Sequence, residues 1–226
     1  MDVVISSENL VRGVRVSSPF AMFILRRASA RLAVLCFVAS AVLPSLSQDQ
    51  APSGVPVFKI TPVSSTIQFD VEASVAIKGT FDKWDATLTF TSADVTTGVL
   101  DIKIQADSVD TGSGMKNGKL KGEKFFNTKQ NPLITFKSTK IVQTGPDTFE
   151  ADGDFTIRGV TKPEKLTVTV SGRGTGSGAI EGTMAFDRKQ YGMNSGIPFI
   201  KIADRVEVTV DLKATRVSGP AVDLKQ

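Results

Sequence analysis

The chain has 226 residues, of which 41% are hydrophobic and 22% are charged, and it contains no histidine and a single cysteine, Cys36. This length corresponds to one domain, with or without a leader that is removed. The missing residue types exclude Ser-His-Asp and Cys-His catalytic relays, Cys/His zinc sites, an internal disulfide and a CxxC redox pair. The sequence therefore predicts no metal site and no cofactor.

The net charge of +4 would suit a nucleic-acid-binding protein, but the position of the charge along the chain argues against one. Residues 1–47 hold five arginines and two acidic residues, a net charge of +3, so the rest of the chain carries only +1. A nearly neutral body offers no continuous basic stripe to phosphates. The sequence therefore predicts no nucleic-acid partner.

The N-terminal segment has the organisation of a secretory signal peptide. Arg26, Arg27 and Arg31 precede an apolar run over residues 32–43, and small residues follow at positions 45 and 47. The run is too short to span a bilayer, so the pattern predicts a signal peptide over 1–47 that is cleaved after residue 47. Met22 stands where such a signal usually begins and is an alternative start of the precursor.

Cleavage would remove Cys36 and release a chain bound for the periplasm or the cell exterior, where a protein without cysteine is at no disadvantage. Residues 48–56 are rich in proline, serine and small side chains and are typical of a linker. At the other end, residues 217–226 contain glycine and proline without a periodic pattern, which predicts a flexible tail.

Apolar and polar residues alternate through most of the chain between these segments, as in strands that bury one face. The clearest case is residues 206–213, where Val, Val, Val and Leu alternate with Glu, Thr, Asp and Lys. The same period recurs, or short apolar runs occur, in the segments 58–60, 67–72, 75–81, 87–91, 100–105, 134–140, 149–158, 165–170 and 183–187.

Short connections with turn residues join these segments, for example at residues 145–146 and 159–163, which predicts antiparallel pairing of sequential strands. Closing such a sheet removes exposed edges, so we expect an all-β, antiparallel eight-stranded barrel over 57–216. The interior of an eight-stranded barrel is either filled by side chains or encloses one small ligand.

Several short motifs follow one another along the barrel segment. They read STIQF at 65–69, KGTFD at 78–82, NPLITFKS at 131–138, GDFTIRGVTKP at 153–163 and DR with YG at 187–192. In the order and spacing of these motifs the chain resembles the YceI-like family, secreted bacterial lipocalin-like barrels that bind polyisoprenoid lipids. It departs from the family at residues 116–120, which read KNGKL in place of a frequent Arg-Asp-x-His-Leu run.

The resemblance implies that inward-facing apolar residues line a long cavity for an isoprenoid tail, carried as a quinone or a polyprenyl phosphate. At about 0.3 kcal/mol per heavy atom, a tail of roughly forty carbons would contribute on the order of 12 kcal/mol without any catalytic group. The alternative is that these residues pack against one another as core. The residues concerned are Phe69, Phe81, Leu88, Phe90, Ile102, Phe126, Phe136, Phe155, Ile157, Met184 and Phe186.

Candidates for binding a polar headgroup lie in two places. Lys116 and Lys119 belong to a cluster of five lysines, which suits a lipid phosphate or a transient contact with an anionic membrane face, or is simply a solvated loop. Arg158, Arg188 and Tyr191 lie at strand ends beside turns. There the alternatives are ion pairs that tie strand ends together and, for the tyrosine, an aromatic plug or gate at the barrel mouth.

Local patterns that resemble catalytic motifs are incomplete. DTGS at 110–113 occurs once, whereas aspartic proteases need a paired second carboxylate. Residues 112–119 lack P-loop spacing, and the glycines of 172–178 join two strands rather than a strand and a helix. The sequence thus predicts an exported, non-enzymatic protein that sequesters or transports a long-chain lipid, whether as a monomer or a homodimer. The alternative is a stress-response or interaction protein with a packed barrel.

Overall fold

The alternating segments form ten strands in the computed structural model, which describes residues 54–74, 76–196, 199 and 201–224. The predictions about the signal peptide and most of the linker concern residues outside these ranges. One α-helix, α1 (Gly114–Lys121), follows the fifth strand. The strands are β1 (Val57–Ala73), β2 (Ile77–Phe81), β3 (Trp84–Thr89), β4 (Val99–Gln105), β5 (Val109–Asp110), β6 (Leu133–Gln143), β7 (Thr148–Ile157), β8 (Val160–Val170), β9 (Ser177–Asp187) and β10 (Ile202–Ser218).

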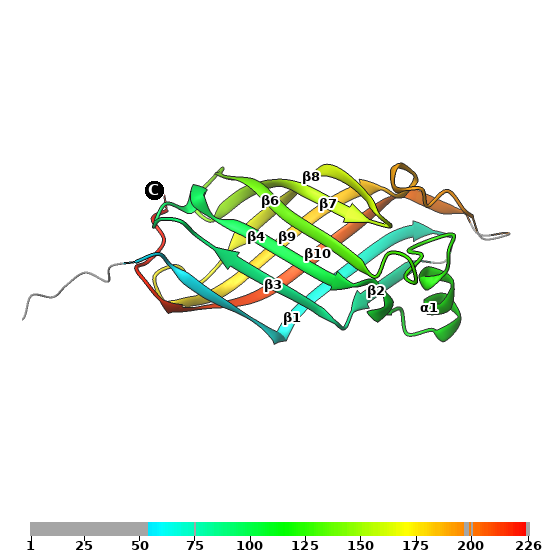
Figure 1. Cartoon of the computed structure of the whole chain (residues 1–226), viewed down its shortest axis with the longest axis horizontal. Coiled ribbons are helices and arrows are strands. Elements are labelled where there is room, and N and C mark those ends of the chain that lie inside the picture. Colours follow the sequence, from blue (N-terminus) through cyan, green and yellow to red (C-terminus); the bar gives the residue numbers. More distant parts are fainter. Residues whose placement is uncertain (1–53, 75, 197–198, 200, 225–226) are drawn as a thin grey trace, which may run out of the picture. The chain divides into compact units, whose positions relative to one another are not determined.

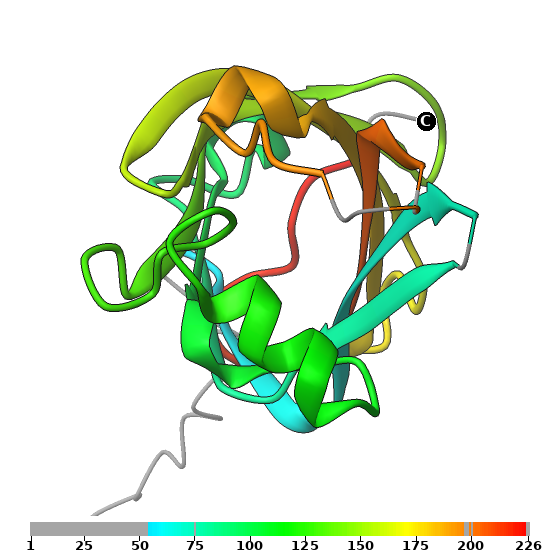
Figure 2. The same cartoon turned by 90° about the vertical axis from the view of Figure 1, so that its right-hand side faces the viewer.

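Eight of these strands close into an antiparallel barrel (Figure 1). They follow one another as β10-β9-β8-β7-β6-β4-β3-β1, and β1 pairs back with β10 over most of its length. The short strands β2 and β5 extend the wall, since β2 pairs with both β1 and β5. The predicted eight-stranded antiparallel barrel is confirmed, and Figure 2 shows it along its axis.

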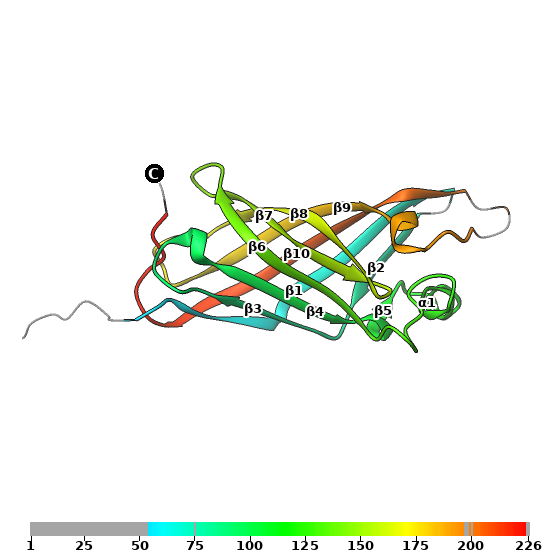
Figure 3. The same cartoon turned by 45° about the horizontal axis from the view of Figure 1, so that its top comes forward.

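The two ends of the barrel differ (Figure 3). At one end, called here the helix end, lie α1 and the connection from β9 to β10. At the opposite end, called the terminal end, lie the β3–β4 connection, the glycine-rich β8–β9 loop and both ends of the described chain. The two openings of the barrel are therefore bordered by different segments of the chain.

A large bulge interrupts the pairing of β1 with β10 between the two ends of the barrel. Thr61 pairs with Lys213 of β10, but Thr66 pairs with Asp211, so the residues between them loop out of the ladder. Pro62 lies in the looped segment, where its missing N–H breaks no strand pairing. The Ser65 hydroxyl closes the bulge by donating to the Thr61 carbonyl (2.6 Å) and accepting from the Lys213 amide (2.7 Å).

The motif at 110–113 forms the turn into α1. The Asp110 carboxylate accepts hydrogen bonds from the Asn117 side-chain amide (3.0 Å) and from the backbone N–H of Gly112 (2.9 Å). These bonds, that of Asn117 foremost, lower the pKa of Asp110. The carboxylate thus joins the turn to α1.

Residues 219–224 lie across the terminal end, within the segment 217–226 for which the sequence predicted a flexible tail. After β10, Gly219 adopts a φ of 81° and passes Val55 so closely that a Cβ would lie 2.0 Å from the Val55 carbonyl oxygen. The Asp223 amide then donates to the Ala93 carbonyl (2.7 Å), and Val222 and Leu224 pack against the core. Residues 219–224, called here the terminal strap, cross this mouth (red in Figure 2).

Candidate ligand-binding interior

The barrel interior holds two apolar cavities, one at each end. The terminal-end cavity has a volume of about 170 Å³ and is lined by Phe58, Leu88, Phe149, Val168 and the strap residue Leu224, among others. The helix-end cavity has a volume of about 70 Å³. Its lining comes from seven strands, α1 and the segments that follow α1 and β9. It includes Ile67, Phe69, Phe81, Ile104, Leu120, Phe126, Phe155 and Phe186.

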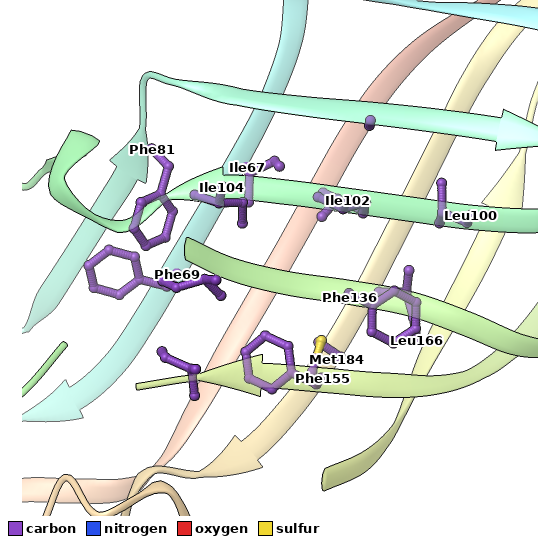
Figure 4. Packing of buried hydrophobic residues seen from close by; sticks show 14 of the residues in the cluster. Ile67, Phe69, Phe81, Leu100, Ile102, Ile104, Phe136, Phe155, Leu166 and Met184 are labelled. Atoms are coloured by element: carbon purple, nitrogen blue, oxygen red, sulfur yellow. The ribbon is translucent and has the colours of Figure 1, made fainter. Parts of the chain in front are cut away.

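A layer of buried side chains, one or two residues deep along each strand, separates the two cavities. Along β4, for example, Leu100 lines the terminal-end cavity, Ile104 lines the helix-end cavity, and Ile102 between them lines neither. The corresponding inward residues of the other strands are also buried and line neither cavity. This central layer consists of Ile60, Ala86, Ile102, Phe136, Leu166, Met184, Val210 and Leu212. Figure 4 shows four of them, from four strands, pointing into the barrel.

Two glycines in the wall make room for the largest side chains of the central layer. A Cβ on Gly153 would come within 2.8 Å of the Phe136 ring, and one on Gly182 would come within 3.1 Å of Leu166. Gly153 lies on β7 and Gly182 on β9, at positions whose next-but-one neighbours along the strand point inward. Because glycine has no side chain, Phe136 and Leu166 occupy the space in front of it and fill the middle of the barrel. The interior is thus packed in the middle and open toward both ends.

The eleven residues predicted to line a cavity fall into three groups, and all of them face the interior. Leu88 and Phe90 line the terminal-end cavity. Phe69, Phe81, Phe126, Phe155, Ile157 and Phe186 line the helix-end cavity. Ile102, Phe136 and Met184 belong to the central layer.

Sequence reasoning missed much of the terminal-end cavity. Phe58 and Phe149 lie in segments where strands were predicted, so their alternation could have found them. Val222 and Leu224 could not be found in this way, because two apolar residues in a short segment form no recognisable period.

Tyr191 is fully buried at the helix end, in the short 3₁₀ turn η3 (Arg188–Tyr191) that follows β9. β8 pairs with β9 from Thr167 to Val170, and Tyr191 reaches Glu164 in the part of β8 before this pairing. The tyrosine ring lies edge-on to Phe155 (5.5 Å between ring centroids) and Phe186 (5.2 Å), and its hydroxyl donates to Glu164 (2.8 Å). The ring therefore packs behind Phe155 and Phe186, two residues that line the helix-end cavity.

The buried hydroxyl of Tyr191 makes stability sensitive to alkaline pH. Burial first, and then the bond to Glu164, raise the pKa of Tyr191 well above its usual value near 10. Because the folded state then holds the proton more tightly than the unfolded state, the stabilisation is complete below about pH 10 and declines above it by about 1.4 kcal/mol per pH unit.

We expect urea unfolding between about pH 8 and pH 11 to show this decline in the wild type and to lack the tyrosine contribution in Tyr191→Phe. The variant should also be about 1 kcal/mol less stable at neutral pH, because it loses the bond to Glu164. Tyr191 is the only tyrosine of the chain, so the ultraviolet absorbance of phenolate reports on it directly. A phenolate that titrates at its ordinary pH in the folded protein would contradict the prediction.

The Arg188 side chain, predicted as a headgroup candidate or a strand-end ion pair, is buried and binds protein groups. Its Nε donates to the Ala203 carbonyl (3.0 Å), and Nη1 donates to the carbonyls of Met193 and Ser195, the latter at 3.0 Å. Nη2 donates to Asp204 (3.1 Å). The guanidinium thus ties η3 and the segment after it to the start of β10, and the ion pair is one part of that set.

Arg158 performs a similar task in the turn between β7 and β8. Its Nη1 donates to the Gly192 carbonyl, and its Nη2 donates to the Glu123 carbonyl (3.0 Å). The residue therefore joins three segments of the helix end through backbone carbonyls rather than through an ion pair. Of the predicted headgroup candidates, Lys119 is exposed and Lys116 is half-buried, and both lie on α1 beside the helix-end cavity.

The family model that describes the YceI-like domain matches residues 58–214. The chain belongs to the YceI-like family. Protein YceI from Escherichia coli O157:H7 is 35% identical over 96 residues, which are 42% of this chain and 50% of that protein. A UPF0312 protein from Pectobacterium atrosepticum is 32% identical over the same length and coverage. The chain thus spans about half the length of the relatives it matches.

Solved structures of two other proteins superpose on this one. BcnA from Burkholderia cenocepacia matches with a TM-score of 0.63 and 25% identity, over 70% of this chain and 100% of that one. A polyisoprenoid binding domain from Saccharophagus degradans matches with a TM-score of 0.54 and 14% identity, over 71% of this chain and 99% of that one. At that identity the second likeness shows a shared fold.

In the part of the YceI-like chain that the structure describes, no helix has the length and apolarity needed to cross a bilayer. The same residues contain no group of three or more His, Cys, Asp or Glu side chains placed to hold a metal ion. The interior is therefore characterised by its apolar cavities and by the cationic segment beside one of them.

Proposed function

We propose that this YceI-like barrel is a non-enzymatic binding protein that holds the tail of an isoprenoid or similar long-chain lipid in its interior, and that it acts as a carrier or reservoir in the periplasm or outside the cell. The observation that carries the proposal is the pair of apolar cavities inside one barrel, separated by a thin layer of side chains. Family membership and the fold shared with a polyisoprenoid binding domain support it.

The size of the cavities determines how a lipid would be held. An apolar cavity of about 150 Å³ accommodates a molecule the size of benzene, and pockets for larger ligands measure roughly 300–1,000 Å³. The terminal-end cavity, at about 170 Å³, would thus accept a short part of an isoprenoid tail. A long tail requires the central layer to move aside and the two cavities to become continuous.

The composition of the central layer favours such a rearrangement. Met184 is unbranched and adapts its shape to new neighbours, and Phe136 stands over a glycine rather than over another large side chain. Displaced side chains would exchange contacts with each other for contacts with the prenyl chain, so little apolar contact would be lost. The tail itself contributes about 0.3 kcal/mol per heavy atom.

The headgroup would remain at the helix end, where Lys116 and Lys119 offer positive charge. A polyprenyl phosphate would pair with these lysines, and a quinone would need no charged partner. Arg158, Arg188 and Tyr191 already bind protein groups, so we assign them the task of holding this end in shape.

Organic extraction of the protein purified from its native compartment, followed by mass spectrometry, tests the proposal. We expect a stoichiometric isoprenoid quinone or polyprenyl phosphate. A protein that is empty on isolation and also fails to take up added quinone from detergent micelles would instead support the second candidate, an interaction protein with a packed barrel, which the close packing of the central layer favours.

A further inference from the structure

We propose that the helix end docks on the surface of an anionic membrane through the lysines of residues 116–129 and the side chain of Met115. The inference rests on the proposed function, because it names the partner from which the interior would receive its lipid. Its observations are a local excess of positive charge, an exposed apolar side chain within it, and an apolar cavity directly behind it.

The charge at this end is concentrated in one segment. Residues 116–129 hold five lysines and a single acidic residue, Glu123, although the chain after residue 47 is nearly neutral. None of the ion pairs formed between described residues involves any of these lysines. The nearby carboxylate of Asp110 is bonded to Asn117 and Gly112. Asp110 also attracts Lys121 electrostatically. The lysines outnumber the nearby carboxylates of Asp110 and Glu123, so the segment offers a net positive charge to an external anionic surface.

The same segment presents an apolar side chain to the outside. Met115 on α1 is 77% exposed, whereas Leu120 of the same helix is partly buried and packs against the core. Apolar side chains next to lysines are typical of segments that lie in the headgroup region of a bilayer. In that position the methionine would leave water and the lysines would meet lipid phosphates.

The segment also borders the interior. Leu120 of α1 and Phe125 and Phe126, which follow the helix, line the helix-end cavity. A docked barrel would therefore place this apolar cavity against the bilayer, with one short segment between them. The opposite mouth is crossed by the terminal strap, whose Val222 and Leu224 cover the other cavity. The structure thus favours the helix end as the side that faces the membrane.

Binding to vesicles tests the inference with a matched control. One variant carries Lys121→Gln, Lys124→Gln and Lys129→Gln, which leaves the headgroup candidates intact. The control carries Lys59→Gln, Lys137→Gln and Lys140→Gln, three exposed lysines of the barrel wall that lose the same net charge. Both are compared with the wild type by co-sedimentation with phosphatidylcholine vesicles that contain phosphatidylglycerol, and with pure phosphatidylcholine vesicles.

We expect the wild type to bind the anionic vesicles, to be released by salt and to ignore the neutral vesicles. Each lysine near an anionic surface contributes about fivefold in affinity, so the first variant should bind about 100-fold more weakly while the control stays close to the wild type. Met115→Ser should weaken binding several-fold with no change in charge. Equal binding of the two triple variants, or equal binding to both kinds of vesicle, would overturn the inference.

Uptake of an isoprenoid quinone separates this inference from the proposed function. Quinone supplied in detergent micelles should load the wild type and both triple variants alike, whereas transfer from anionic vesicles should be slower for the first variant alone. Lysine-dependent vesicle binding without quinone uptake from either source would uphold the docking surface and overturn the carrier function. Uptake from both sources at equal rates in all three proteins would overturn docking and leave the carrier function in place.

Discussion

Replacement of Phe136 with alanine is expected to lower the free energy of unfolding by about 3–5 kcal/mol and, at the same time, to speed the uptake of isoprenoid quinone. The stability loss follows from burial, since Phe136 is 4% exposed and lies between its ladder partners Ile102 and Phe155. Uptake should become faster because the Phe136 ring belongs to the central layer, and its removal would open a passage between the two cavities.

Phe149→Ala is the matched control for this prediction. Phe149 is equally buried and loses the same atoms on substitution, but it lines the terminal-end cavity and does not belong to the central layer. Urea unfolding should show comparable destabilisation of the two variants, and quinone uptake from micelles should be faster for Phe136→Ala only. If both variants lose stability and neither takes up quinone, the barrel is a packed scaffold.

Replacement of Arg188 with glutamine should lower the free energy of unfolding by about 3 kcal/mol, because several buried partners lose a charged donor at once. The guanidinium donates to three carbonyls and to Asp204, and its side chain is 8% exposed. Glutamine reaches few of these groups. Hydrogen exchange should accelerate at the amides of η3 and at the start of β10, while the amides of the terminal end keep their protection.

Arg205→Gln provides the comparison within the same region. The Arg205 side chain is 69% exposed and pairs with Glu207, itself 62% exposed, an arrangement that contributes less than about 1 kcal/mol. Thermal or urea unfolding should therefore separate the two arginine variants clearly. A small loss for Arg188→Gln, similar to that for Arg205→Gln, would show that the bonds of Arg188 do not hold the helix end.

The strands and the barrel could be predicted because the period of two depends on local sequence. Apolar and polar residues alternate strictly over residues 206–213. These residues form the middle of β10, which closes the barrel by pairing with β1. Where the period breaks, prediction was less complete. Residues 58–60 and 67–72 read as separate segments, yet they belong to the single strand β1, because the bulge at Pro62 interrupts the pattern without ending the strand.

The interior was predicted as a set of apolar residues but not as two cavities. Alternation shows which side chains face inward, whereas the place where they meet depends on contacts across the barrel, such as Phe136 over Gly153. The burial of Arg188 and Tyr191 was hidden for a similar reason. They bind residues up to 27 positions away in the sequence, namely Ala203, Asp204 and Glu164. A local sequence pattern does not indicate that a charged side chain will be buried among backbone carbonyls.

The contact between Gly219 and Val55 has a practical consequence for surface-based measurements. Because the two ends of the described chain lie together at the terminal end, a support attached near either of them would hold every molecule with the same orientation. The lysine-bearing face would then point into the flowing solution. A sensor chip prepared in this way would present a uniform layer to injected liposomes, and no part of the signal would arise from molecules facing the wrong way.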